Sequence, residues 1–131
     1  MAKSKILVVD DDPKLSRLVR LVLEKTDLYE VSEENRATNV LARAKGLRPD
    51  AILLDVDMPE KDGGQVAKEI AADSTLRQTP VMFLTSLISS SDGREVMAGG
   101  VRFLAKPVNP ATLISAVGRL VSSSMSMAAH V

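Results

Sequence analysis

Residues 6–13 of this chain read ILVVDDDP, an apolar run that ends in three consecutive aspartates and a proline. An apolar run without a polar interruption is typical of a strand that is buried on both faces. Asp12 and Pro13 are a favourable N-cap and first-turn pair, so we expect a helix to begin directly after this strand. The stretch therefore predicts a buried strand, a turn that carries acidic side chains, and a helix.

Similar apolar runs recur along the chain. Including the first run, the chain has four of them: Ile6–Val9, Ala51–Leu54, Val81–Leu84 and Val101–Ala105. Only the last is interrupted, by an arginine. Runs of this kind indicate a parallel sheet that is covered by helices. A fifth run, Tyr29–Glu33, alternates apolar and polar residues and predicts a half-exposed edge strand.

Helical periodicity separates these runs. Apolar residues at helical spacing form four sets: Leu15, Leu18, Val19, Val22 and Leu23; Val40, Leu41, Ala44 and Leu47; Val66, Ala67, Ile70 and Ala71; and Leu113, Ala116, Val117 and Leu120. Asn109 and Pro110 repeat the N-cap device before the last set. For the Ser-rich stretch Ser89–Met97 we predict a short helix. The β-α order predicts an α/β domain, an open five-stranded parallel sheet with helices on both faces.

Composition narrows the class of protein. The 131 residues suit one domain, and seventeen basic residues balance seventeen acidic ones. We find no basic run that would bind nucleic acid, no cysteine for disulfide or thiolate chemistry, and no apolar segment long enough to cross a bilayer. We therefore expect a cytoplasmic protein that binds neither nucleic acid nor membrane.

Polar side chains follow four of the buried runs. Asp10 and Asp11 follow the first, Asp55 the second, Thr85 the third and Lys106 the fourth. Because the carboxyl ends of parallel strands meet at one edge of a sheet, these groups are expected to converge.

Charge determines the chemistry of such a cluster. Three close carboxylates repel one another, and Mg²⁺ prefers oxygen ligands, so Asp10, Asp11 and Asp55 are a candidate magnesium site. Asp55 could then act as a nucleophile towards a phosphoryl donor. Lys106 would neutralise the charge that develops on the phosphoryl oxygens, and the Thr85 hydroxyl would donate a hydrogen bond to one of them. Taken one at a time, the aspartates and Thr85 could instead be helix caps or turn residues, and Lys106 a solvated surface lysine.

Taken together, the segments ILVVDDDP, LLDVDMPEKDGG, MFLTS and RFLAKP resemble the receiver domains of two-component response regulators. The resemblance covers residues 4–121, and it implies a CheY-like sheet with strand order 2-1-3-4-5. The remaining residues, 122–131, read SSSMSMAAHV and are expected to be a flexible tail or linker stub.

The resemblance also implies roles for single residues. Asp55 matches the phosphoacceptor, Asp10 and Asp11 match the acidic pair that holds Mg²⁺, and Asp57 matches the position whose backbone carbonyl completes the metal shell. Thr85 matches the switch hydroxyl, and Phe103 matches the switch aromatic. Lys106 matches the phosphate-binding lysine of the family, which is commonly followed by a cis proline.

The implied partners are a sensor histidine kinase or histidine phosphotransfer protein, which donates the phosphoryl group, and an effector protein. The effector would bind the face made by the predicted helix Ser89–Met97, the strand after it and the last helix. Such a domain is a signalling switch that catalyses its own phosphorylation and dephosphorylation. Two alternatives remain: a haloacid-dehalogenase-type phosphatase, which also uses a D-x-D motif such as Asp55–Asp57, and a non-phosphorylated pseudo-receiver scaffold.

Overall fold

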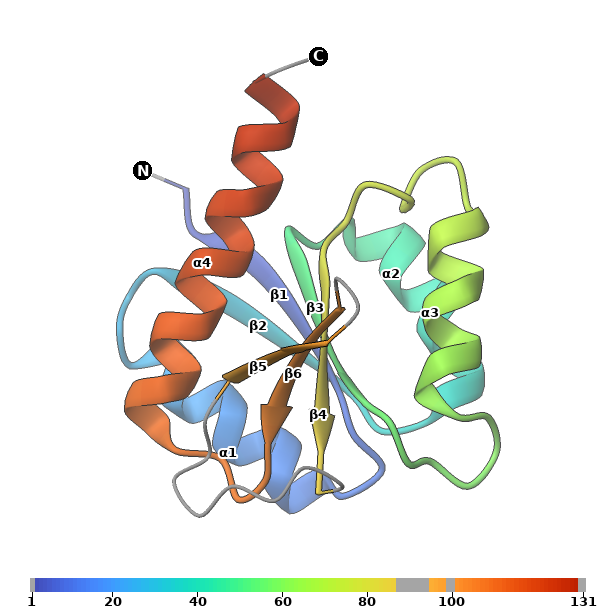
Figure 1. The fold of residues 1–131 in the computed structure, drawn as a ribbon, viewed down its shortest axis with the longest axis horizontal. Coiled ribbons are helices and arrows are strands. Elements are labelled where there is room, and N and C mark those ends of the chain that lie inside the picture. Colours follow the sequence, from blue (N-terminus) through green and yellow to red (C-terminus); the bar gives the residue numbers. More distant parts are fainter. Residues whose placement is uncertain (1, 87–94, 99–100, 130–131) are drawn as a thin grey trace.

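The computed structural model describes residues 2–86, 95–98 and 101–129, which form a sheet with helices on both faces (Figure 1). The strands are β1 (Ser4–Val9), β2 (Tyr29–Glu34), β3 (Ala51–Asp55), β4 (Val81–Thr85), β5 (Glu95–Ala98) and β6 (Val101–Ala105). Their spatial order is β2-β1-β3-β4-β6-β5, and the first five in this order are parallel. The predicted parallel sheet and its order, with β6 as the fifth predicted strand, are therefore confirmed.

The register of the parallel strands brings their carboxyl ends into line. Asp55 at the end of β3 pairs with Leu84, and Thr85 at the end of β4 pairs with Ala105. The residue after β1, Asp10, and the residue after β6, Lys106, thus lie at the same edge of the sheet as Asp55 and Thr85.

The structure adds an edge strand that the sequence did not predict. Within the segment Ser89–Met97, for which we predicted a helix, residues 89–94 lie outside the described residues, and Glu95–Ala98 forms β5. This strand is antiparallel to β6. The helix prediction is wrong for residues 95–97, because pairing with β6 satisfies backbone groups that the edge of the sheet would otherwise leave open.

Two of the helices begin at caps that the sequence indicated. They are α1 (Pro13–Glu24), α2 (Val40–Leu47), which follows the short 3₁₀ helix η1 (Ala37–Asn39), α3 (Gly63–Ala72) and α4 (Pro110–Ala129). The side chain of Asp12 accepts a hydrogen bond from Lys14 N (3.0 Å), and that of Asn109 accepts one from Thr112 N (3.1 Å). Both predicted N-caps are confirmed.

The last helix extends further than the sequence indicated. Helix α4 continues to Ala129, and its final turns project beyond the sheet (Figure 1). We predicted a flexible tail or linker stub for residues 122–131, and helix α4 includes residues 122–129 of this segment. Ser, Met and Ala tolerate a helix, and these residues carry no proline or glycine that would end it.

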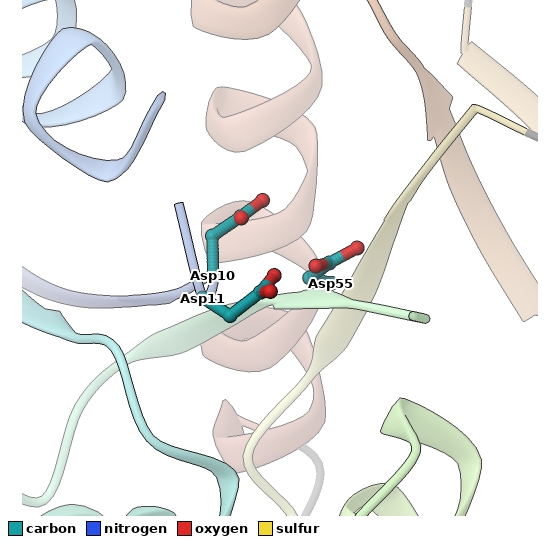
Figure 2. A group of neighbouring side chains, drawn as sticks. All are labelled: Asp10, Asp11 and Asp55. Carbon is teal, nitrogen blue, oxygen red and sulfur yellow. The ribbon is translucent and has the colours of Figure 1, made fainter. Parts of the chain in front are cut away.

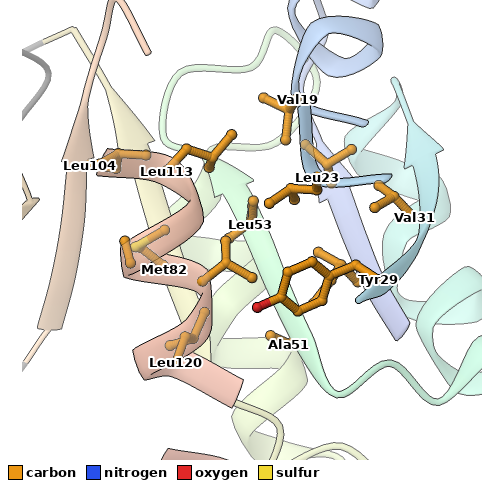
Figure 3. Close-up of a cluster of buried hydrophobic side chains, with 14 of the residues drawn as sticks. Val19, Leu23, Tyr29, Val31, Ala51, Leu53, Met82, Leu104, Leu113 and Leu120 are labelled. Carbon is orange, nitrogen blue, oxygen red and sulfur yellow. The ribbon is translucent and has the colours of Figure 1, made fainter. Parts of the chain in front are cut away.

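Two apolar layers fill the space between the sheet and its helices. On one face, side chains of α1 and α4 such as Val19, Leu23 and Leu113 pack against Leu53 and Met82 of the sheet (Figure 3). The other layer lies between the sheet and the helices α2 and α3. Its fully buried members include Leu7, Val40, Ile52, Leu54 and Ile70. The core is almost wholly aliphatic, and it holds the strand ends in fixed positions.

Gly63, at the start of α3, packs directly against the end of β3. Its backbone N–H donates to Val56 O (2.9 Å). A Cβ atom at this position would overlap the carbonyl oxygen of Asp55 and lie 2.9 Å from the Cα atom of Val56. Both atoms belong to the backbone, which cannot move aside as a flexible side chain can. A glycine is thus required where α3 approaches the strand that carries Asp55.

We expect Gly63→Ala to lower the free energy of unfolding by about 1–3 kcal/mol, because the added methyl group forces the backbone apart. Gly46→Ala is the matched control, since no atom lies within 4 Å of a Cβ placed at this position in α2. Alanine is also the better helix former, so the control should be neutral or stabilising. Urea unfolding, followed by circular dichroism, measures the free energy of unfolding of both variants. Equal stability of the two variants would contradict the close approach.

Candidate functional site

Asp55 is the central carboxylate of the candidate site. It ends β3, and 2% of its surface is exposed. Its Oδ1 accepts a hydrogen bond from the backbone N–H of Asp57 (3.2 Å) and one from Lys106 Nζ (3.2 Å). The local turn and the end of β6 thus fix the orientation of a buried acidic group.

Asp10 and Asp11 approach Asp55 from the end of β1. Asp10 is fully buried and Asp11 is exposed. Asp10 Oδ1 accepts a hydrogen bond from Asp12 N (2.9 Å), which holds its side chain against the turn. Each of the three carboxylates offers an oxygen, and these oxygens lie within 4.8 Å of one another (Figure 2). The predicted convergence of the aspartates is therefore present.

Lys106 supplies positive charge to the two buried carboxylates. Its Nζ lies 3.0 Å from Asp10 Oδ2 and 3.2 Å from Asp55 Oδ1. Burial alone would lower the pKa of the ammonium group, but the contacts with Asp10 and Asp55 outweigh burial and raise this pKa above its usual value. Lys106 therefore stays charged at neutral pH. The peptide bond between Lys106 and Pro107 is cis, as the resemblance implied.

Burial makes Asp55 harder to ionise than an ordinary aspartate. Burial, together with the negative charge of Asp10, raises the pKa of Asp55 from 3.8 to about 6. The hydrogen bond from Asp57 N and the charge of Lys106 lower this pKa but do not offset the rise. The charge of Lys106 therefore does not fully compensate the negative charges of Asp10 and Asp55.

The donor set fits a hard divalent cation. Asp10 Oδ2 is buried and accepts no hydrogen bond within the described part of the chain. Its 3.0 Å contact with Lys106 Nζ is an ion pair with a lysine that also contacts Asp55. A buried carboxylate oxygen without a donor is costly, and a cation can satisfy it. The three carboxylates Asp10, Asp11 and Asp55 thus match the oxygen ligands that Mg²⁺ prefers.

Three other predicted residues lie in the turn after β3 or in the neighbouring strands β4 and β6. Thr85 is buried at the end of β4, and its carbonyl accepts a hydrogen bond from Lys106 N (2.9 Å). Asp57 is exposed. Phe103 in β6 is half-buried, and its ring stacks on Phe83 of β4 with 5.5 Å between the ring centroids. The sequence analysis did not identify Phe83 as a candidate residue, although Phe83 lies within the predicted strand Val81–Leu84.

The sequence analysis also missed two polar residues beside the acidic turn. Asn35 follows β2 and donates a hydrogen bond to the backbone carbonyl of Asp10 (2.8 Å). Ser16 of α1 is fully buried and accepts a hydrogen bond from the same amide nitrogen (2.9 Å). Asn35 could have been found by the reasoning that identified Asp55, because it too follows the carboxyl end of a strand. Ser16 carried no comparable signal.

The pKa of Asp55 predicts how stability depends on pH without metal. Since this pKa is about 6 in the folded chain and 3.8 in a free aspartate, the folded state holds the proton more tightly. The free energy of unfolding therefore falls as pH rises from about 4 to about 6. Asp55→Asn removes this penalty, so we expect it to stabilise the metal-free protein at pH 7.5 by on the order of 2 kcal/mol.

Thermal unfolding in EDTA at pH 7.5 and pH 5.0 measures this effect. The advantage of Asp55→Asn over the wild type should shrink at the lower pH, where Asp55 is mostly protonated. Asp27→Asn is the control, because the side chain of Asp27 is 91% exposed and lies outside the site. A gain that is absent at pH 7.5, or is equally large for Asp27→Asn, would refute the buried-charge explanation.

Comparison with known proteins places this arrangement in a family. The model of the response regulator receiver domain matches residues 6–118. The chain is 37% identical over 118 residues to the response regulator PleD of Caulobacter vibrioides. The matched region is 89% of this chain but only 26% of PleD. It is 30% identical to the polar-differentiation response regulator DivK of Brucella anthropi, covering 89% of this chain and 94% of DivK. The chain thus spans about a quarter of one relative and nearly all of another.

Solved structures agree with this match. The chemotaxis response regulator CheY4 of Vibrio cholerae superposes with a TM-score of 0.77 at 32% identity, over 91% of this chain and 99% of that one. The receiver domain of the sensor histidine kinase PA1611 from Pseudomonas aeruginosa, solved with a magnesium ion in its active site cleft, gives 0.78 at 29% identity, over 92% and 99%. Neither the phosphatase nor the scaffold alternative is supported. The chain belongs to the receiver domains of response regulators, which are phosphoacceptor domains of two-component signal transduction.

Proposed function

We propose that Asp55 is the residue that accepts the phosphoryl group, and that Asp10, Asp11, Asp55 and the backbone carbonyl of Asp57 hold Mg²⁺. The observation that carries this proposal is that oxygens of the three carboxylates lie within 4.8 Å of one another. One oxygen of this group, the buried Asp10 Oδ2, pairs with Lys106 Nζ but accepts no hydrogen bond from the residues that the structure describes. Bound Mg²⁺ would neutralise charge on the phosphoryl oxygens.

Asp55 is prepared for nucleophilic attack by its surroundings. Its pKa of about 6 leaves it mostly ionised at pH 7.5. Asp57 N and Lys106 Nζ both donate to Oδ1, so we expect Oδ2 to attack the phosphorus atom of an N-phosphohistidine. The new O–P bond forms as the P–N bond breaks, and the imidazole leaves with the electron pair and is protonated. The product is an acyl phosphate on Asp55.

Lys106 and Thr85 are the groups that would respond to the new charge. The phosphoryl group adds close to two negative charges and three acceptor oxygens beside Lys106 Nζ. Lys106 would move from the carboxylate of Asp55 to a phosphoryl oxygen, and the Thr85 hydroxyl would donate to another. A shift of Thr85 in β4 would reach Phe103 through the neighbouring strand β6 and change the surface there.

The donor and the target of this switch follow from the family. We infer that a sensor histidine kinase or histidine phosphotransfer protein donates the phosphoryl group in the cytoplasm. We further infer that an effector protein binds the face that includes β6 and α4, and that this domain binds neither nucleic acid nor membrane. None of the helices in the described part of the chain is long and apolar enough to span a bilayer. The domain would catalyse its own phosphorylation and dephosphorylation.

Intact mass after incubation with acetyl phosphate tests the acceptor. We expect the wild type to gain the mass of one phosphoryl group when Mg²⁺ is present and none in EDTA. Asp55→Asn should gain nothing, because its amide is not a nucleophile, whereas Asp27→Asn should behave as the wild type does. Phosphorylation of Asp55→Asn, or metal-independent labelling of the wild type, would exclude the proposed site. Continuous release of phosphate over many turnovers would indicate a phosphatase instead.

Lys106→Met tests the competition between lysine and metal. Because Lys106 Nζ contacts the same carboxylates that would bind Mg²⁺, its removal should tighten Mg²⁺ binding. The same change should slow phosphorylation by acetyl phosphate at least tenfold, since a charge that stabilises the transferring group is lost. Calorimetric titration with Mg²⁺ and mass spectrometry measure the two effects. Weaker Mg²⁺ binding in this variant would contradict the competition.

A further inference from the structure

A continuous series of hydrogen bonds joins the acidic turn to α1 and β2. Asn35 Nδ2 donates to the backbone carbonyl of Asp10 (2.8 Å) and to Ser16 Oγ (2.9 Å). Ser16 Oγ donates to Glu33 Oε1 (2.9 Å), and Glu33 Oε2 accepts from Arg20 Nη1 (3.0 Å). The series thus runs from an exposed arginine on α1 to the peptide group that links Asp10 and Asp11.

Counting hydrogen atoms fixes the direction of these bonds. An amide nitrogen carries two hydrogens, and Asn35 uses both, one for the Asp10 carbonyl and one for Ser16. A hydroxyl carries one hydrogen, and the carboxylate of Glu33 is a stronger and closer acceptor for Ser16 than Pro13 O, which lies 3.2 Å away. Since Ser16 is fully buried, losing the hydrogen bond from Asn35 would leave a buried acceptor unsatisfied.

The bond to the Asp10 carbonyl acts on both members of the acidic pair. A peptide group is planar, so fixing this carbonyl also fixes the N–H of Asp11 and the plane from which its side chain departs. Two further bonds hold the turn: Asp10 N donates to Glu34 O (3.1 Å), and Asp12 N donates to Asp10 Oδ1 (2.9 Å). Asp11 itself is exposed, so its direction depends on this backbone more than on packing.

We propose that Asn35, held in place by Ser16, is a positioning residue for the metal site: it orients the Asp10–Asp11 peptide so that both carboxylates face Asp55. This inference rests on the proposed function, in which those carboxylates bind Mg²⁺. Asn35 acts through the backbone of Asp10, since both of its amide hydrogens are engaged there and at Ser16. Groups that orient metal ligands typically change metal affinity by about 10–100-fold when they are lost.

Calorimetric titration with Mg²⁺ alone at pH 7.5 tests the proposal. We expect Asn35→Leu, which keeps the side-chain size and removes both donors, to raise the dissociation constant for Mg²⁺ about tenfold. Asn39→Leu is the matched control, because the amide of Asn39 contacts the Glu34 carboxylate at 3.4 Å and not the acidic turn. The control should stay within about twofold of the wild type.

Two further measurements separate positioning from a merely structural role. The Mg²⁺ concentration that gives half-maximal phosphorylation by acetyl phosphate should rise in Asn35→Leu, while the rate at saturating Mg²⁺ stays near that of the wild type. Ser16→Ala keeps Asn35 but removes its support. It should weaken Mg²⁺ binding in the same direction, and its effect should be non-additive with that of Asn35→Leu.

The outcomes distinguish the two proposals. A lower melting temperature with an unchanged dissociation constant for Mg²⁺ in Asn35→Leu would overturn the positioning role. If Asn35→Leu does not fold, an unchanged Mg²⁺ affinity in folded Ser16→Ala would overturn it instead. A wild type that binds no Mg²⁺ would refute the proposed function itself, and the positioning role with it.

Discussion

The close packing of the buried carboxylates Asp10 and Asp55 around Lys106 is the constraint on which the rest of the site depends. The two carboxylates lie at the ends of strands that neighbour each other in the sheet, so the fold itself brings them together. Lys106 contacts both, yet the pKa of Asp55 still rises to about 6. The folded domain therefore retains unfavourable electrostatic energy, which a bound cation would relieve.

The free energy gained by burying the apolar layers on both faces of the sheet offsets this unfavourable electrostatic energy. Strand β3 and the second half of β1, which lead to Asp55 and Asp10, are buried between α1 and α4 on one face and α2 and α3 on the other. Gly63 lets α3 approach the backbone of Asp55 closely, which leaves the end of β3 little room to relax. A rigid scaffold thus keeps like charges together.

Much of the candidate site was predictable because it follows from one rule. Polar residues placed directly after buried strands must meet when the strands are parallel and in register, and Asp10, Asp55, Thr85 and Lys106 all obey this rule. Asn35 obeys it as well and could have been included. Ser16 could not, since a serine on an amphipathic helix shows its burial and its hydrogen bonds only when the neighbouring strand is in place.

The sequence by itself determined the alternation of strands and helices, the two N-caps and the order in which acidic, hydroxyl and ammonium groups reach the sheet edge. These features depend on local periodicity and on short-range hydrogen bonds. The tertiary structure decided that residues 95–98 pair with β6 and that α4 continues to Ala129. It also decided the raised pKa of Asp55, because burial and the charge of Asp10 arise only when residues distant in the chain are packed together.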